Sequence, residues 1–213
     1  MRITTCFAIV RLIIVVVFAL GIGVSSATAR SGPPRPDVPP VPINLEVPEG
    51  HELYLAGYAL GTQNYICMPA PTASGVAWRF LGPQATLFRT TSGDPRQQVT
   101  THFLSVNPVE NLARPTWQHS TDSSRIWGRV KASSNDSNFV APGAIDWLLV
   151  EAAGSEGGPI GGGILAHTTF IHRVNTSGGT APLVGCSDVG QIGTLALVPY
   201  STDYFFYRAR PAR

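Results

Sequence analysis

The stretch TWQHSTDSSRIWGRV, residues 116–130, has the pattern of a β-hairpin. Two short runs that each carry a tryptophan flank Thr-Asp-Ser-Ser, and such residues favour tight turns because their short side chains bond nearby backbone groups. Side chains of a strand alternate between its two faces. In residues 125–132 one face is expected to meet solvent or a ligand, and it carries Arg125, Trp127, Arg129 and Lys131.

The same β pattern continues along the chain. Short runs rich in aromatic and β-branched residues alternate with Gly, Pro, Asn, Asp and Ser, and no window of a dozen residues has the apolar period of a helix. The expected strands are His51–Tyr58, Gln63–Met68, Ala77–Leu81, Ala85–Thr90, His102–Val106, Thr116–His119, Arg125–Ala132, Ile145–Ala152, Gly163–Asn175, Thr194–Pro199 and Tyr204–Arg208. Many short strands favour an all-β antiparallel sandwich or barrel, and both alternatives remain open.

The apolar run IDWLLV, residues 145–150, stands out among these strands. A strand with solvent on one face alternates apolar and polar residues, whereas this run is almost continuously apolar. It is therefore expected to be covered on both sides.

The first 29 residues have the order of a secretory signal peptide. Arg2 and Arg11 flank the start of an apolar run that continues to Val24, and Ala27-Thr28-Ala29 supplies the small residues that precede cleavage. The run is shorter than the ~20 residues that a membrane-spanning helix needs, although an uncleaved anchor is the alternative. We expect a signal helix at residues 1–29 that is removed, a secreted or extracellular protein, and no membrane span after cleavage.

Proline dominates the segment that follows. Seven of residues 31–48 are proline, which fixes φ and lacks the amide hydrogen that helices and inner strands require. Residues 30–48 are therefore expected to form an extended linker, with a single all-β domain at residues 49–213.

The net charge of the chain without its signal peptide argues against a nucleic-acid-binding protein. Loss of Arg2 and Arg11 with the signal peptide reduces the 15 Lys and Arg residues to 13, which balances the 13 Asp and Glu residues. Nucleic-acid binding usually needs a basic excess, so no nucleic-acid partner is predicted.

Cys67 and Cys186 are the two cysteines outside the signal segment, and an oxidising compartment favours a disulfide between them. The alternative, a thiol pair that binds metal, lacks nearby ligands at the usual spacing.

The sequence carries no recognisable catalytic motif. His167 and His172 are five residues apart, so on a strand they point to opposite faces and cannot share a metal. The glycine-rich segment Ser155–Gly163 lacks the spacing of a nucleotide-binding loop and is interpreted as a flexible connection. There is also no G-x-S-x-G or H-E-x-x-H. No catalytic residue, metal ligand or cofactor is predicted.

A group of aromatic residues and two glycosylation sequons indicate where a ligand or a glycan would attach. Trp117 and Trp127, with His119 nearby, are the candidate ligand-binding residues, because tryptophans at a barrel mouth suit sugar rings or apolar ligands. Packing in the core is the alternative for both tryptophans. Asn135 and Asn175 begin N-glycosylation sequons, which matter only in a eukaryotic host.

Several segments in order resemble a family of secreted fungal and bacterial proteins known as domain of unknown function 3455. They are GTQNYIC, RPTWQHSTDSSRIWGRV, IDWLLVEAAG, GGILAHTTFIHRVNTSGGTAPLVGC and VPYSTDYFFYR, within residues 49–208. The resemblance implies a signal peptide and two matching cysteines, but no activity or catalytic residue. Some fungal members are labelled malate dehydrogenase, yet this chain lacks the Rossmann fingerprint and βαβ alternation of such enzymes.

The sequence thus favours a secreted, disulfide-linked β-domain that acts as a binding or surface-interaction module rather than an enzyme. Its expected partner is an extracellular ligand, such as a carbohydrate or a component of a host or cell wall. The alternative is a secreted hydrolase or lyase whose site is assembled from scattered Asp, Glu and His residues.

Overall fold

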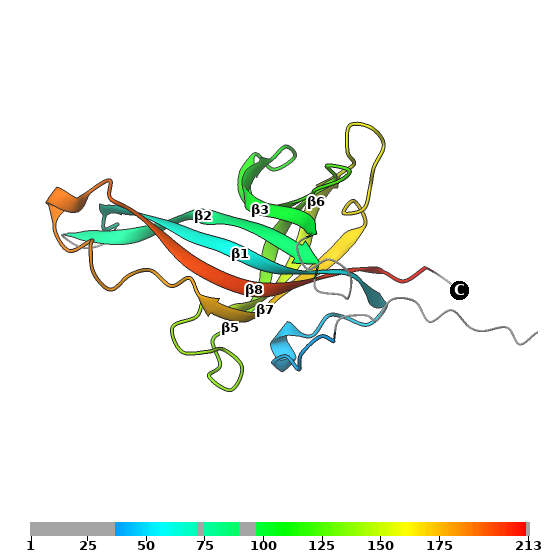
Figure 1. The fold of residues 1–213 in the computed structure, drawn as a ribbon, viewed down its shortest axis with the longest axis horizontal. Coiled ribbons are helices and arrows are strands. Elements are labelled where there is room, and N and C mark those ends of the chain that lie inside the picture. Colours follow the sequence, from blue (N-terminus) through cyan, green and yellow to red (C-terminus); the bar gives the residue numbers. More distant parts are fainter. Residues whose placement is uncertain (1–36, 72–74, 90–96, 212–213) are drawn as a thin grey trace, which may run out of the picture. The chain divides into compact units, whose positions relative to one another are not determined.

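A computed structural model describes residues 37–71, 75–89 and 97–211. These residues form one closed antiparallel barrel in which each strand pairs with the next and β8 returns to β1 (Figure 1). The strands are β1 (His51–Pro69), β2 (Val76–Arg89), β3 (Gln98–Asn107), β4 (Leu112–His119), β5 (Arg125–Ser134), β6 (Trp147–Glu156), β7 (Thr168–Gly178) and β8 (Leu195–Ala209). The all-β prediction is confirmed, and of its two alternatives the barrel is the one that forms.

The hairpin predicted from residues 116–130 joins β4 to β5, with Trp117 opposite Ile126 and Thr116 opposite Trp127. Trp127, however, is buried, whereas its face was expected to meet solvent or a ligand. Its indole Nε1 donates to Ser105 Oγ at 2.9 Å, so the side chain packs against β3 on the outside of the barrel.

β1, β2 and β8 each join two segments that the sequence pattern predicted as separate strands. Gly61 does not interrupt β1; it allows a close approach to β2, since a Cβ there would lie 2.1 Å from the carbonyl oxygen of Gln84. Pro83 lies in β2 beyond the last β2–β3 pair, Gln84 with Phe103, where no amide hydrogen is needed for that ladder. Gly61 and Pro83 therefore lie within long strands and do not end them.

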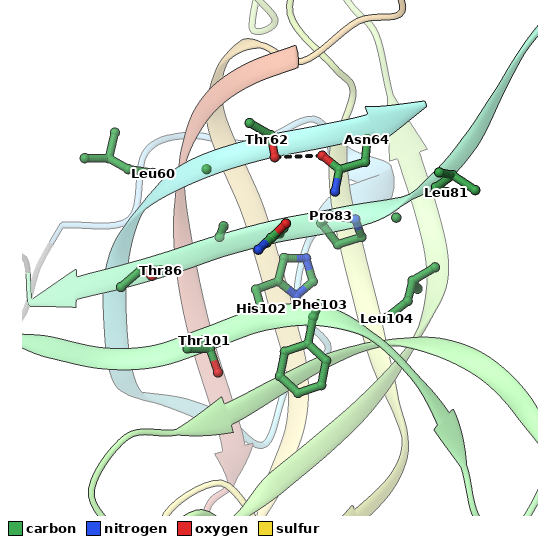
Figure 2. A pocket seen from close by; sticks show the side chains of 14 residues that line it. Leu60, Thr62, Asn64, Leu81, Pro83, Thr86, Thr101, His102, Phe103 and Leu104 are labelled. Atoms are coloured by element: carbon green, nitrogen blue, oxygen red, sulfur yellow. Dashed lines mark hydrogen bonds between the residues drawn. The ribbon is translucent and has the colours of Figure 1, made fainter. Parts of the chain in front are cut away.

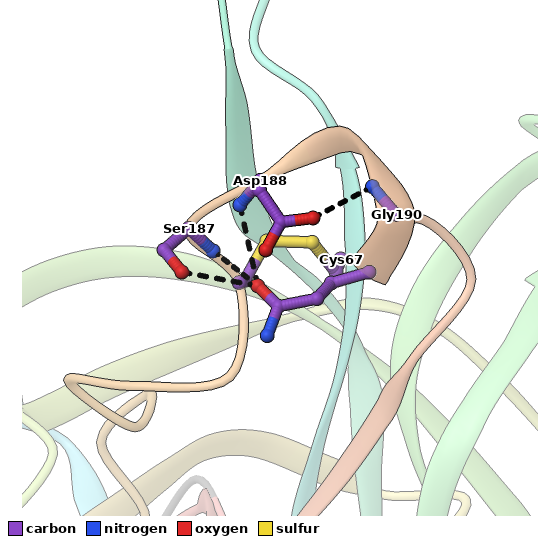
Figure 3. Close-up of a disulfide and its surroundings, with 6 residues drawn as sticks. Cys67, Ser187, Asp188 and Gly190 are labelled. Atoms are coloured by element: carbon purple, nitrogen blue, oxygen red, sulfur yellow. Dashed lines mark hydrogen bonds between the residues drawn. A yellow bond between two sulfur atoms is a disulfide. The ribbon is translucent and has the colours of Figure 1, made fainter.

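A disulfide links Cys67, near the end of β1, to Cys186 in the segment that leads to β8, with Cα atoms 5.4 Å apart (Figure 3). The predicted pairing is confirmed. Next to it, Asp188 caps the short 3₁₀ turn Val189–Gln191, and Gln191 Oε1 accepts hydrogen bonds from the backbone amides of Ser187 and Asp188. The cross-link spans 119 residues, which in the chain-entropy model corresponds to about 4–5 kcal/mol of stability.

Apolar side chains pack on both sides of the barrel wall. Leu148 and Val150 belong to the interior of the barrel, whereas Trp147 and Leu149 belong to a second cluster outside it. The run IDWLLV is thus covered on both sides, as predicted.

The outer cluster is covered in part by residues 37–48, a segment that the sequence pattern assigned to a linker. Leu45, in the 3₁₀ turn Ile43–Leu45, is completely buried in this cluster. Its carbonyl oxygen lies 2.6 Å from His172 Nε2, and the other ring nitrogen of His172 lies 3.2 Å from the hydroxyl of Tyr207. Prolines keep the segment extended, but its apolar residues dock it on the barrel. The predicted signal peptide, residues 1–29, lies outside the described part of the chain.

In the described residues, no helix has the length and apolar character required to cross a bilayer.

Candidate ligand-binding site

One end of the barrel is filled by the connection between β6 and β7. Leu165 in this connection is completely buried in the interior cluster. Its backbone amide donates to Ser124 Oγ, and the amide of Ile164 donates to Asp122 Oδ2. Both acceptors lie in the β4–β5 turn. We call this side the closed end.

Glycines allow the connection to lie against that turn. A Cβ on Gly158 would meet the Asp122 carbonyl oxygen at 1.7 Å, and one on Gly162 would meet the Asp122 side chain at 2.2 Å. The glycine-rich segment, expected to be a flexible connection, is therefore built for close packing.

A histidine, an aspartate and a serine meet at the closed end but do not form a catalytic relay. Ser124 donates to Asp122 Oδ1 at 2.7 Å, and His119 Nδ1 lies 3.3 Å from the same oxygen. In a relay the histidine stands between serine and aspartate, whereas here both contact the aspartate. Hydrogen bonds from Ile164 and Ser124 lower the pKa of Asp122 against the effect of its burial. The group holds the closed end together.

The other end of the barrel contains a cavity of about 220 Å³, and we call it the open end. The lining side chains come from every strand of the barrel and are mostly apolar. They belong to Gln63, Phe80, Pro83, His102, Leu104, Pro115, Trp117, Val130, Leu148, Val150, Arg173 and Tyr204. No Asp or Glu is among these described residues, so the cavity suits an apolar ligand with a few directed polar groups.

His102 and Trp117 form one wall of the cavity. They occupy paired positions on β3 and β4, and their rings stack with centroids 4.2 Å apart and planes 11° apart. Trp117 has room because its indole ring lies against Gly128 of β5, where a Cβ would lie 3.1 Å from the ring. Burial lowers the pKa of His102 to about 3, so the ring is neutral near pH 7. Its Nδ1 lies 2.9 Å from the Thr116 carbonyl oxygen, which accepts its hydrogen and leaves Nε2 as an acceptor.

Several buried polar atoms in or beside the cavity make no hydrogen bond of good geometry, although Tyr200, Tyr204, Gln63 and Arg173 lie close enough to shift the pKa values of the two tyrosines. They are Gln63 Nε2, Trp117 Nε1 and the hydroxyls of Tyr200 and Tyr204. All four residues are at most 4% exposed, and burial raises the pKa of both tyrosines. An unpaired buried polar atom costs about 1–3 kcal/mol, so such a cluster is unusual in a finished core. Ligands with complementary groups would relieve this cost.

Arg173 stands where the cavity meets the surface. Together with Gln63, Phe80 and Leu148 it lines both the cavity and an open depression of about 430 Å³, which we call the mouth. Its Nε and one terminal nitrogen donate to the Asp146 carbonyl oxygen at 3.1 and 2.8 Å. The side chain is thereby fixed at the entrance.

A groove of about 870 Å³ lies on the outside of β1–β3, and it shares Pro83, His102 and Leu104 with the cavity. Figure 2 shows the ring of His102 directed toward Pro83, between β2 and β3, while Phe103 points the other way. Because the β2–β3 ladder stops at Gln84, only side chains separate the groove from the cavity at this seam.

The structure separates the three predicted ligand-binding residues. Trp117 lines the cavity, His119 lies at the closed end, and Trp127 packs outside the barrel. Most of the cavity was missed because it depends on barrel closure, which brings distant strands together. Arg173 is the residue from which the sequence could have indicated the cavity, because it is a charged residue on the same strand face as the apolar Ile171.

The remaining predicted positions lie elsewhere. His167 is exposed and precedes β7, whereas His172 is buried under Leu45, so the two histidines share no site. Asn135 and Asn175 are both exposed, and Asn175 Nδ2 donates to Asp203 Oδ2 at 2.8 Å. No group of three His, Cys, Asp or Glu residues in the described ranges is arranged to hold a metal ion.

Fold and site together define a small up-and-down β-barrel with one closed end and one open end that contains a cavity. Residues 48–208 match the family model described as "Protein of unknown function (DUF3455)", and the chain belongs to that family. No curated protein and no solved structure matched the chain.

Proposed function

We propose that this domain is an extracellular binding module that holds a small, mainly apolar ligand in the open end of its barrel. The observation that carries the proposal is the cavity of about 220 Å³ bordered by buried polar atoms without partners. An engineered apolar cavity of about 150 Å³ binds benzene, so the volume suits a single ring or a short chain.

The chemistry of the cavity favours binding over catalysis. A hydrolase or lyase needs an acid or base that changes protonation near neutral pH. The histidine in this cavity has a pKa of about 3, and no described carboxylate lines the cavity beside it. The groups that are present can orient a ligand by hydrogen bonds.

The extracellular part of the proposal rests on the signal-like residues 1–29 and agrees with the disulfide between Cys67 and Cys186. Expression in a secreting host tests it: the exported protein should begin at Arg30 by amino-terminal sequencing. Retention of Met1 in the membrane fraction would contradict export by cleavage.

Binding is tested with neutral probes of the right size. Benzyl alcohol and indole at 1–10 mM, a range of roughly one to ten times the Kd reachable by so few atoms, should raise the thermal unfolding midpoint of the mature protein. Leu148→Phe should abolish this rise, because the larger ring occupies the cavity. Its own midpoint without probe should be unchanged or higher, since filling a cavity commonly adds about 0.5–2 kcal/mol.

Val109→Phe is the matched control, because Val109 is 88% exposed and away from the cavity. This variant should respond to the probes like the unmodified protein. The proposal fails if neither probe shifts the midpoint, or if Leu148→Phe responds as strongly as the control.

A further inference from the structure

We infer that the ligand of the open end carries a single carboxylate, which Arg173 binds at the mouth while the apolar part of the ligand fills the cavity. This inference rests on the proposed function and adds the chemical class of the ligand. It predicts small aromatic or short-chain monocarboxylic acids rather than neutral apolar molecules.

Arg173 carries a positive charge that no nearby carboxylate of the described residues balances. Arg114, Arg125, Arg129 and Arg208 each lie within 3.0 Å of a glutamate oxygen. Arg173 is half-buried, yet no carboxylate of the described residues lies within 4.0 Å of it. Asp146 lines the mouth with Arg173 but meets it through its backbone carbonyl. A partly buried cation without a counter-charge is destabilised, and an anionic ligand would remove that cost.

Arg173 and Gln63 have hydrogen-bond donors available at the mouth. Two of the five guanidinium N–H groups can be assigned to the Asp146 carbonyl and one more lies toward the Tyr204 hydroxyl, which leaves at least two. Gln63, which lines both cavity and mouth like Arg173, has an unpartnered Nε2. A carboxylate accepts about four hydrogen bonds and suits the planar fork of arginine. Donors from β1 and β7, the two strands that flank β8, thus line the same mouth.

The site becomes less polar from the mouth into the cavity. Beyond Arg173 the walls are formed by Leu104, Pro115, Val130 and Val150, with the Trp117–His102 stack at the side. An acid that enters with its apolar part first would place its carboxylate at Arg173 and keep it in contact with water at the mouth. The reverse orientation would bury the anion against apolar side chains, which is costly.

The test compares probes of similar size that differ in charge. Benzoate and benzyl alcohol are titrated into the mature protein at pH 7.5, and hexanoate distinguishes an aliphatic from an aromatic apolar part. Benzoate or hexanoate should bind at least tenfold more tightly than benzyl alcohol by calorimetry. The acids are expected to bind with low millimolar affinity. Their advantage over benzyl alcohol should decrease as the salt concentration rises, as expected for a partly exposed ion pair.

Variants assign the preference to one side chain. Arg173→Gln should remove the preference for the acid and leave the affinity for benzyl alcohol within twofold, whereas Arg173→Lys should keep part of it. Arg129→Gln is the control, since Arg129 pairs with Glu151 on the exposed surface. It should behave like the unmodified protein.

The outcomes separate the two proposals. If benzyl alcohol binds as tightly as the acids, or if Arg173→Gln keeps the preference, the carboxylate inference is overturned and the cavity proposal stands. If no probe binds, both fail. Should Arg173→Gln not fold, the comparison of acid and alcohol in the unmodified protein still decides the matter.

Discussion

The two ends of the barrel are built from the same eight strands but differ in how completely they are filled. At the closed end, Leu165 fills the interior and Asp122 accepts hydrogen bonds from Ile164 and Ser124. At the open end, a cavity remains, and four buried polar atoms around it have no partner. Arg173 also has no carboxylate of the described residues within 4.0 Å. Because the same strands form both ends, the difference in filling comes from the connections between strands and from the sizes of the side chains that point inward.

This contrast shows that the cavity is not a general weakness of the fold. The chain can fill a barrel end, and it does so where the β6–β7 connection folds over; there the Asp122 carboxylate is hydrogen-bonded, and of the closed-end residues Thr100, paired with His119, has a buried hydroxyl without a partner. Unfilled volume and unpaired groups occur together at the other end, which is the combination expected where a ligand completes the core.

The largest expected change in the free energy of unfolding comes from a comparison of two Leu→Ala substitutions, one at each end of the barrel. Leu165→Ala should lower the free energy of unfolding by about 2–5 kcal/mol, because the side chain is fully enclosed. Leu148→Ala, which enlarges an existing cavity and removes fewer contacts, should cost clearly less. Chemical denaturation of both variants measures the difference, and equal losses would mean that the two ends are packed alike.

The next effect concerns the polar group of the closed end. Asp122→Ala should cost about 1.5–3 kcal/mol, because the Ile164 amide and the Ser124 hydroxyl lose their charged acceptor. Amide hydrogen exchange of Ile164 and Leu165 should accelerate in this variant. Unchanged exchange at these two residues would show that the connection is held by something else.

Acid should destabilise the protein through its buried histidines. Burial lowers the pKa of His102 to about 3, whereas in the unfolded chain it lies near 6.5. Below pH 6.5 the unfolded state therefore binds a proton that the folded state does not. The free energy of unfolding should fall by up to about 1.4 kcal/mol per pH unit from this group as the pH drops toward 3.

His119 and His172, whose pKa values are also lowered by burial, should add to this slope. His102→Asn keeps a donor for the Thr116 carbonyl oxygen but cannot be protonated. It should reduce the slope between pH 6.5 and 4.5, as measured by denaturation at several pH values. A slope identical to that of the unmodified protein would contradict a neutral, buried His102.

The smallest effect separates two tyrosine hydroxyls. Tyr54 OH lies 2.6 Å from Thr168 Oγ1, near the closed end, so Tyr54→Phe should cost about 0.5–1.5 kcal/mol. Tyr204 OH lies near Tyr200 and Arg173 but makes no hydrogen bond of good geometry, so Tyr204→Phe should be neutral or slightly stabilising without ligand. If Tyr204→Phe were the costlier change, its hydroxyl would already be satisfied and the open end would not await a ligand.

Local sequence patterns predicted much of the fold but little of the site. Strand alternation located the β4–β5 hairpin and the doubly covered run at residues 145–150, and compartment reasoning paired Cys67 with Cys186. The cavity depends on closure between β8 and β1, which places Gln63, Trp117 and Arg173 together although they are far apart in the chain. Such juxtaposition has no periodic signature. Packing of residues 37–48 was equally hidden, because prolines signal an extended backbone and not its contacts.

The most direct test of the account is a benzoate titration followed by the tryptophan indole N–H signals in a ¹H–¹⁵N NMR spectrum. Trp117 and Trp147 both have a buried Nε1 without a partner, but Trp117 lines the cavity and Trp147 packs in the outer cluster. Binding in the open end predicts a saturable shift of the Trp117 signal with little change at Trp147. A Trp117 signal that stays fixed up to 10 mM benzoate, roughly ten times the weakest Kd expected for such a ligand, would contradict it.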